Sequence, residues 1–210
     1  MLVKICGITN WPDARQAVKA GAKLLGFNFC PESPRYIEPR KAAGIIRRLP
    51  RKVGAVGVFV NQAEEVMLDI ARSVGLDYLQ LHGDESPETV ARLRRTLPVI
   101  KAVRVRKTLR AAQVAPYRRA DALLLDGFDL RARGGTGRSF QWAMARRARR
   151  YGRVFLAGGL KPENAAQAIR IARPYAIDVC SGVEAKPGKK DHARVTALMR
   201  AVGAARRRQP

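Results

Sequence analysis

Eight alternations of a short apolar run and a helical pattern, spaced roughly 25 residues apart, predict an α/β fold of the (β/α)8 TIM-barrel class. Sequential parallel strands need crossover helices, and a helical pattern follows each apolar run. The 210 residues suit a compact barrel. A doubly wound open sheet is the alternative, but the first turn lacks the G-x-G-x-x-G phosphate motif of that fold. No linker divides the chain, so we expect one domain over residues 1–205 and a basic tail over 206–210.

The expected elements follow one another regularly along the chain. Apolar runs predict strands at residues 2–5, 22–28, 53–60, 78–81, 99–103, 122–125, 154–157 and 175–179. Helical spacing predicts helices at residues 12–20, 39–49, 62–74, 109–115, 141–151 and 163–172, with two more that begin at 86 and near 190.

Particular residues mark the ends of these helices. Gly21 and Gly75 stand where a left-handed residue closes a helix. Asn61 is a candidate N-cap for the helix at 62–74. Ser86 followed by Pro87 predicts an N-cap and a first helical residue.

Composition narrows the class of protein. The three cysteines Cys6, Cys30 and Cys180 are odd in number and far apart, which indicates neither a disulfide framework nor a zinc site. No apolar run approaches the roughly 18 residues of a membrane span. The start of the chain lacks the features of a secretory signal. We therefore expect a cytoplasmic protein with reduced thiols and no membrane partner.

The charge is strongly basic. Forty-one basic and 17 acidic residues give a net charge of +24. Such an excess attracts polyanions, so a nucleic-acid-binding barrel is one hypothesis. The excess is mostly arginine spread over predicted helices, without a zinc finger or a helix-turn-helix motif. Solvated helix faces explain it more simply, and we expect no specific nucleic-acid partner.

Polar side chains share one parity at the ends of several predicted strands. Along a barrel strand, side chains alternate between the interior and the helix layer. The interior parity holds Lys4, Cys6, Gln80, His82, Asp126, Asp178 and Cys180. Barrel enzymes carry their chemistry at the carboxyl ends of the strands, so the pattern predicts an active site there. Cys6 on its own would be read as a small buried side chain.

Glycine-rich loops follow the last three predicted strands. Glycine lets backbone N–H groups approach an anion closely, and the seventh and eighth loops are the usual phosphate site of a barrel. We predict a phosphate site at Gly135, Thr136, Gly137, Gly158, Gly159, Ser181 and Gly182.

Six motifs lie near the predicted strand ends. They are Lys4-Ile5-Cys6-Gly7-Ile8-Thr9, Ser33-Pro34-Arg35-Tyr36, Gln80-Leu81-His82-Gly83, Leu125-Asp126 with Gly134-Gly135-Thr136-Gly137, Ala157-Gly158-Gly159-Leu160, and Ser181-Gly182-Val183-Glu184. In this order, over nearly the whole chain, they resemble the phosphoribosylanthranilate isomerase family of tryptophan biosynthesis. The resemblance implies a barrel without cofactor or metal. It also implies a small-molecule substrate, N-(5-phosphoribosyl)anthranilate, and an Amadori rearrangement to 1-(2-carboxyphenylamino)-1-deoxyribulose 5-phosphate.

The resemblance implies two catalytic roles. Cys6 matches the family's general base, and Asp126 matches its general acid. A thiol ordinarily titrates near pH 8.5, so the base needs a positive charge close by. Lys4, on the same interior face, is the candidate for that charge.

Substrate contacts are implied as well. Arg35 matches the residue near the anthranilate carboxylate, where a guanidinium suits a bidentate contact. We expect His82 to position groups in the pocket, and Asp178 either to bind a ribose hydroxyl or to pair with Lys4. Cys30 is expected to have no role.

Some alternatives stay open. Another phosphosugar barrel, such as indole-glycerol-phosphate synthase or a histidine-pathway isomerase, shares the phosphate loops but not a cysteine after the first strand. Cys180 departs from the family, in which a second serine is common before Ser181. The loop at 127–133 is more basic than expected, which leaves its substrate contacts open. Both a monomer and a homodimer are compatible with the sequence.

Overall fold

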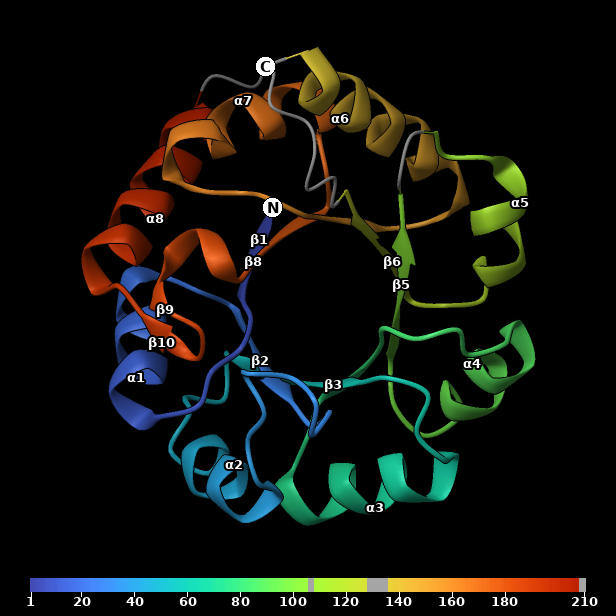
Figure 1. The fold of residues 1–210 in the computed structure, drawn as a ribbon, viewed down its shortest axis with the longest axis vertical. Coiled ribbons are helices and arrows are strands. Elements are labelled where there is room, and N and C mark those ends of the chain that lie inside the picture. Colours follow the sequence, from blue (N-terminus) through green and yellow to red (C-terminus); the bar gives the residue numbers. More distant parts are fainter. Residues whose placement is uncertain (106–107, 128–135, 208–210) are drawn as a thin grey trace.

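The computed structural model describes residues 1–105, 108–127 and 136–207, and for residues 136–141 and 206 it describes the backbone alone. Eight parallel strands close into a barrel in sequence order, with β1 beside both β2 and β8 (Figure 1). The strands are β1 (Leu2–Ile5), β2 (Leu24–Asn28), β3 (Gly54–Phe59), β4 (Tyr78–Leu81), β5 (Val99–Arg104), β6 (Ala122–Asp126), β7 (Val154–Ala157) and β8 (Ala176–Val179). The predicted barrel is confirmed.

Helices surround the barrel as an outer ring (Figure 1). They are α1 (Trp11–Ala20), α2 (Pro39–Ile46), α3 (Glu64–Val74), α4 (Pro87–Leu93), α5 (Ala111–Val114), α6 (Thr136–Ala148), α7 (Pro162–Ala172) and α8 (His192–Arg207). Short 3₁₀ helices add η1 (Ala115–Tyr117), η2 (Arg149–Tyr151) and η3 (Ser181–Val183). A small antiparallel hairpin, β9 (Glu184–Lys186) and β10 (Lys189–Lys190), was not expected from the sequence.

Of the two predicted N-caps, one is present in the structure and the other is not. Ser86 caps α4 as predicted, because its Oγ accepts a hydrogen bond of 3.2 Å from Thr89 N. The prediction for Asn61 was wrong, since α3 begins only at Glu64. Asn61 instead takes a left-handed φ of 50°, and its amide oxygen accepts a hydrogen bond of 2.7 Å from Asp84 N. Its side chain therefore connects two loops rather than capping a helix.

Two helix starts also differ from the prediction. Helix α6 begins at Thr136, ahead of the predicted residue 141, so the glycine at 137 falls in its first turn. Glycine is tolerated there because the first N–H groups of a helix have no partner within it. Helix α8 begins at His192 because β10 takes up the two preceding lysines, and it continues through residues 206 and 207, which we expected in a tail.

The core has two layers that fix the position of the strand ends. Inside the barrel, a buried cluster fills the space between the strands, so the barrel is packed and not a pore. Its members are Leu24, Val56, Ile100, Ala102, Ala122, Leu124, Phe155, Ala157 and Ala176. A larger cluster packs the outer faces of the strands against the helices. Burying one such aliphatic or aromatic side chain stabilises the fold by roughly 1.5–3 kcal/mol.

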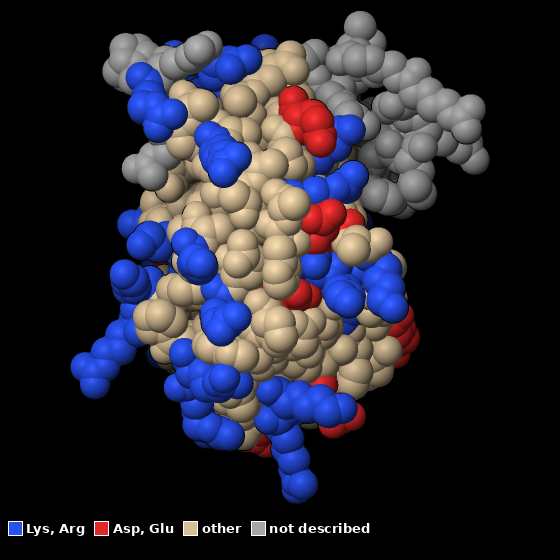
Figure 2. Space-filling view, turned by 90° about the vertical axis from the view of Figure 1, so that its left-hand side faces the viewer, with Lys and Arg blue, Asp and Glu red and all other residues tan. Residues whose placement is uncertain are grey.

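Basic side chains are dispersed over the surface. On the face in Figure 2, lysines and arginines are separated by uncharged residues and do not gather into one stripe. Some are paired on the surface, as Arg92 is with Glu64 and Arg94 with Asp121. Over the described ranges, no helix has the length and apolar character needed to cross a bilayer.

Candidate active site at the carboxyl ends of the strands

A cavity of about 230 Å³ lies at the carboxyl ends of the barrel strands. Eight predicted site residues line it, namely Cys6, Arg35, His82, Asp126, Gly158, Gly159, Asp178 and Ser181. The lining also includes Asn28, Ser33, Gln80, Leu160 and Cys180, which were not among the predicted site residues. Residues from the first strand to the last therefore meet at one site.

A buried ion pair lies beneath this cavity, and its aspartate lines the wall. Lys4 Nζ lies 2.9 Å from Asp178 Oδ1, and the Lys4 side chain is fully buried. The two residues lie directly opposite each other in the β1–β8 register. Burial raises the pKa of Asp178 to about 6, against the opposing effect of Lys4. Of the two roles considered for Asp178, the pairing with Lys4 is thus present, and it keeps a cation on the interior face of β1.

The Cys6 sulfur lies next to this pair. A methyl group added at Gly26 would come within 2.7 Å of Cys6 Sγ and 2.9 Å of Lys4 Nζ, so only a glycine on β2 leaves room for both groups. The neighbouring Cys180 thiol lowers the pKa of Cys6 most, burial opposes this effect, and the charge of Lys4 lowers the pKa further. The net result is a pKa well below the ordinary value of a thiol, which favours thiolate at neutral pH.

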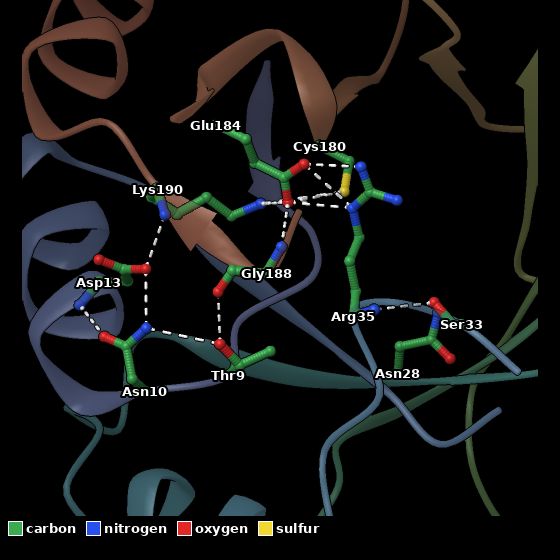
Figure 3. Close-up of polar contacts among 10 residues, drawn as sticks. All are labelled: Thr9, Asn10, Asp13, Asn28, Ser33, Arg35, Cys180, Glu184, Gly188 and Lys190. Carbon is green, nitrogen blue, oxygen red and sulfur yellow. Dashed lines mark hydrogen bonds and ion pairs between the residues drawn. The ribbon is translucent and has the colours of Figure 1, made fainter. Parts of the chain in front are cut away.

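Near the turn that follows Cys6, Arg35 is held by a carboxylate that we did not predict. Arg35 Nη2 lies 2.6 Å from Glu184 Oε2, and Arg35 Nε donates to both carboxylate oxygens at 3.0 and 3.1 Å (Figure 3). This hydrogen bonding raises the pKa of Arg35. Arg35 N also donates to Ser33 Oγ at 3.2 Å, which fixes the loop after β2. Gly7, with a φ of 74°, leaves room for the arginine, since an added Cβ would lie 2.9 Å from its Cδ.

Glu184 also binds a second cation. Lys190 Nζ lies 2.9 Å from Glu184 Oε1 and 3.8 Å from Cys180 Sγ (Figure 3). The backbone N–H of Lys190 donates to Asp13 at 2.7 Å, and Gly188 O accepts a hydrogen bond from Thr9 (Figure 3). The β9–β10 hairpin is therefore held at the start of α1, and its Glu184 carboxylate reaches Arg35 at the cavity wall.

Asp126, at the end of β6, has a histidine neighbour. His82 Nε2 lies 3.4 Å from Asp126 Oδ2, and both side chains are about one-quarter exposed, at 23% and 24%. The other ring nitrogen of His82 lies 3.0 Å from Gln80 Nε2. Gln80 is buried, and its Oε1 has no hydrogen-bond partner among the described residues. These three residues thus present a carboxyl group, an imidazole ring and an amide oxygen that is available to accept a hydrogen bond.

The predicted phosphate loops are located in part. Gly158 and Gly159 follow β7 with φ values of 83° and 61°, and Asn164 Nδ2 donates to Gly159 O at 2.9 Å to fix the turn. Ser181 follows β8 in η3 and lines the cavity, whereas Gly182 lies outside the lining, against the Leu160 carbonyl.

The sixth loop is described less completely. Gly135 lies outside the described residues. Thr136 and Gly137 start α6, and only their backbone is described. Within the described part of the chain, no three His, Cys, Asp or Glu side chains are grouped so that they could hold a metal ion.

Three neighbours of the site were not among the predicted site residues, namely Cys180, Glu184 and Lys190. A signal for Cys180 was present, because it shares the parity of Asp178 and a closed barrel places β8 beside β1. Glu184 and Lys190 carry no periodic signal, since strands of three and two residues are too short to show alternation.

Known proteins resemble the chain along nearly its whole length. The family model for N-(5′-phosphoribosyl)anthranilate (PRA) isomerase matches residues 3–201. An N-(5′-phosphoribosyl)anthranilate isomerase of Trichlorobacter lovleyi is 50% identical over 199 residues, which cover 94% of this chain and 96% of the relative.

Solved structures of phosphoribosyl anthranilate isomerases have the same fold as this chain. Phosphoribosyl anthranilate isomerase from Thermotoga maritima superimposes with a TM-score of 0.89 at 43% identity, covering 97% of this chain and all of that one. A phosphoribosyl anthranilate isomerase in complex with reduced 1-(o-carboxyphenylamino)-1-deoxyribulose 5-phosphate superimposes with a TM-score of 0.87 at 42% identity, with the same coverage.

Proposed function

The chain belongs to the N-(5′-phosphoribosyl)anthranilate isomerase family, and we propose that Cys6 is the general base and Asp126 the general acid of its reaction. The enzyme converts phosphoribosylanthranilate into the corresponding 1-deoxyribulose 5-phosphate. One observation carries the assignment: the cysteine that follows β1 and the aspartate that ends β6 line the same cavity, from strands three positions apart around the barrel. An acid and a base can therefore approach one sugar from different sides.

The reaction needs a proton donor first. Asp126, in its protonated form, gives its proton to the ring oxygen of the furanose while the bond from that oxygen to C1′ breaks. The lone pair of the anilino nitrogen forms the new double bond to C1′, which gives a protonated Schiff base. General acid catalysis of this kind contributes roughly 10²- to 10⁴-fold to a rate.

The base acts second. The Cys6 thiolate removes the proton from C2′, and the electrons of that bond neutralise the Schiff base to give an enolamine. The enol oxygen then releases its proton while C1′ gains one, which yields the ketone. The depressed pKa of Cys6 supports this role, because the thiolate and not the thiol accepts the proton.

Arg35 is the proposed partner of the anthranilate carboxylate. Glu184 occupies its Nε and Nη2, and among the described residues nothing accepts a hydrogen bond from its Nη1. Although Glu184 offsets one charge, Lys190 adds another, so the three groups together remain cationic. This net charge favours an anionic ring substituent.

The ribose and phosphate contacts complete the proposal. The free Oε1 of Gln80 and the second carboxylate oxygen of Asp178 are suitable acceptors for ribose hydroxyls. His82 positions Asp126, from 3.4 Å away. The phosphate is proposed to bind the backbone of the last three loops, at Gly135, Thr136, Gly137, Gly158, Gly159, Ser181 and Gly182.

The direct test is an assay with phosphoribosylanthranilate, whose fluorescence disappears on conversion. Wild type should consume it, whereas C6S and D126N should each lose turnover by orders of magnitude with little change in Tm. The exposed Asp69 provides a matched control as D69N, which should retain wild-type rates. Near-normal turnover by C6S would remove Cys6 as the base, and near-normal turnover by D126N would remove Asp126 as the acid.

A further inference from the structure

Two cysteines face each other where the barrel closes. In the β1–β8 register, Lys4 lies opposite Asp178 and Ile5 opposite Val179, so the next pair in line is Cys6 and Cys180. The backbone hydrogen bond of 2.9 Å from Cys6 N to Val179 O continues the pairing to this point. Adjacent strands lie about 4.8 Å apart, and disulfides join residues whose Cα atoms are roughly 4.4–6.8 Å apart. The backbone spacing therefore suits a disulfide.

The two side chains also point the same way. Both cysteines line the cavity, and the Cys180 thiol is the neighbour that lowers the pKa of Cys6 most. A Cβ added at Gly7 would lie 3.1 Å from Cys180 Sγ, so the turn after β1 packs directly against this second thiol. Both cysteines are free in the structure.

The surroundings favour oxidation of this pair. Lys4 lies beside Cys6, and Lys190 Nζ lies 3.8 Å from Cys180 Sγ. The cation beside Cys6 stabilises its thiolate, and the thiolate is the form that oxidants attack. Cys6 and burial raise the pKa of Cys180, so the second thiol keeps its proton. A thiolate at a cavity wall with a second thiol next to it has the arrangement of a redox-sensitive site with a resolving cysteine.

We propose that Cys6 and Cys180 form an oxidation site at which a small hydroperoxide produces an intramolecular disulfide. The Cys6 thiolate attacks one peroxide oxygen, the O–O bond breaks, and hydroxide or alkoxide leaves, which gives a sulfenic acid. The Cys180 sulfur then attacks the Cys6 sulfur, the S–O bond breaks, and hydroxide leaves with the proton of Cys180 as water. The two thiols lose two hydrogens, and the peroxide is reduced.

The disulfide would remove the Cys6 thiolate from the active site. The accompanying loss of turnover rests on the proposed role of Cys6 as the base, whereas formation of the bond does not. A dithiol reductant would restore both thiols. The bond would also protect Cys6 from irreversible oxidation to the sulfinic acid.

The test is peptide mapping of the full-length protein after brief exposure to hydrogen peroxide and alkylation of the remaining thiols. Trypsin should release peptide 5–15, which holds Cys6, joined to peptide 171–189, which holds Cys180. The joined mass should disappear after dithiothreitol treatment, and most of the starting activity should return.

Two variants make the test specific. C30S removes the cysteine that contacts Glu32 in the loop after β2, and it should form the same joined peptide as wild type. C180S should give no joined peptide. It should also progress to sulfinic acid on Cys6, so that dithiothreitol restores a smaller fraction of its own starting activity.

Two results would overturn the proposal. One is wild-type protein that is oxidised at Cys6 without forming the joined peptide. The other is a joined peptide that contains Cys30. Because peptide mapping does not measure turnover, it tests formation of the disulfide independently of the assignment of Cys6 as the base.

Discussion

The Glu184 carboxylate accepts hydrogen bonds from two nitrogens of Arg35, and Arg35 Nη2 lies 2.6 Å from Glu184 Oε2. Arg35 lines the same cavity as Cys6. The same carboxylate binds Lys190 at 2.9 Å and is only 4% exposed. A buried carboxylate between two cations fixes both of them in place, since each would otherwise rotate freely. The hairpin that carries Glu184 therefore orients a residue 149 positions away in the sequence.

We predict that E184Q weakens substrate binding more than turnover. Glutamine keeps the shape of the side chain but loses the charge that orients Arg35, so KM should rise about tenfold, equivalent to roughly 1.4 kcal/mol, while kcat changes less. E32Q is the matched control, because Glu32 lies in the same loop as Arg35 but contacts Cys30. Equal KM values for E184Q and wild type would show that Glu184 does not position Arg35.

Parity along the strands predicted much of the inner site. Lys4 and Asp178 were expected on one face and are found in contact at 2.9 Å, because alternation is strict in a closed barrel and its closure places β8 beside β1. The same alternation places the residues of the other parity in β6 and β8 against the helices, namely Leu123, Leu125, Ile177 and Val179. These relationships follow from geometry that every strand shares.

Contacts made by irregular segments could not be predicted in this way. Glu184 and Lys190 come from a hairpin whose two strands pair with a register shift, and no spacing rule assigns such a segment a partner. Lys101 is a second example, because it lies on the outer face of β5, where apolar residues are expected. Its partner Glu85 comes from a loop, so the pairing appears only in three dimensions.

The Lys101–Glu85 ion pair yields a prediction about stability. Lys101 Nζ lies 2.8 Å from Glu85 Oε2, both side chains are nearly buried, and Glu85 also accepts a hydrogen bond from Asn61 N. K101M should leave a buried carboxylate without its cation and lower the free energy of unfolding by about 3–5 kcal/mol, measured in urea.

Two further variants test this explanation. K41M, which removes an exposed lysine paired with Glu38, should cost less than about 1 kcal/mol. K101M/E85Q should recover part of the loss, because the unpaired charge is removed as well. A K101M protein as stable as wild type would mean that the pair is dispensable.

The contact between Cys180 and Cys6 predicts a shift in the pH dependence of turnover. The thiolate is the active base, so kcat/KM should rise with pH through the pKa of Cys6 and then level off. The Cys180 thiol lowers that pKa, so C180A should raise it and move the acidic limb of the profile to higher pH. C30A should leave the limb in place. An unmoved limb in C180A would show that Cys180 does not stabilise the thiolate.

Asp178 predicts a pH dependence of stability with the opposite sign to that of most carboxylates. Burial raises its pKa from the ordinary 3.8 to about 6, so between these values the folded protein holds a proton that the unfolded chain releases. The free energy of unfolding should therefore fall as pH rises through this window, by about 3 kcal/mol at roughly 1.4 kcal/mol per pH unit.

Asparagine cannot titrate, so D178N should lack this decline, and the wild-type advantage over D178N should shrink between about pH 4 and pH 6. Urea unfolding at several pH values measures this, with the exposed D69N expected to run parallel to wild type. Parallel curves for wild type and D178N would mean that Asp178 takes up its proton at the same pH in the folded and unfolded chains.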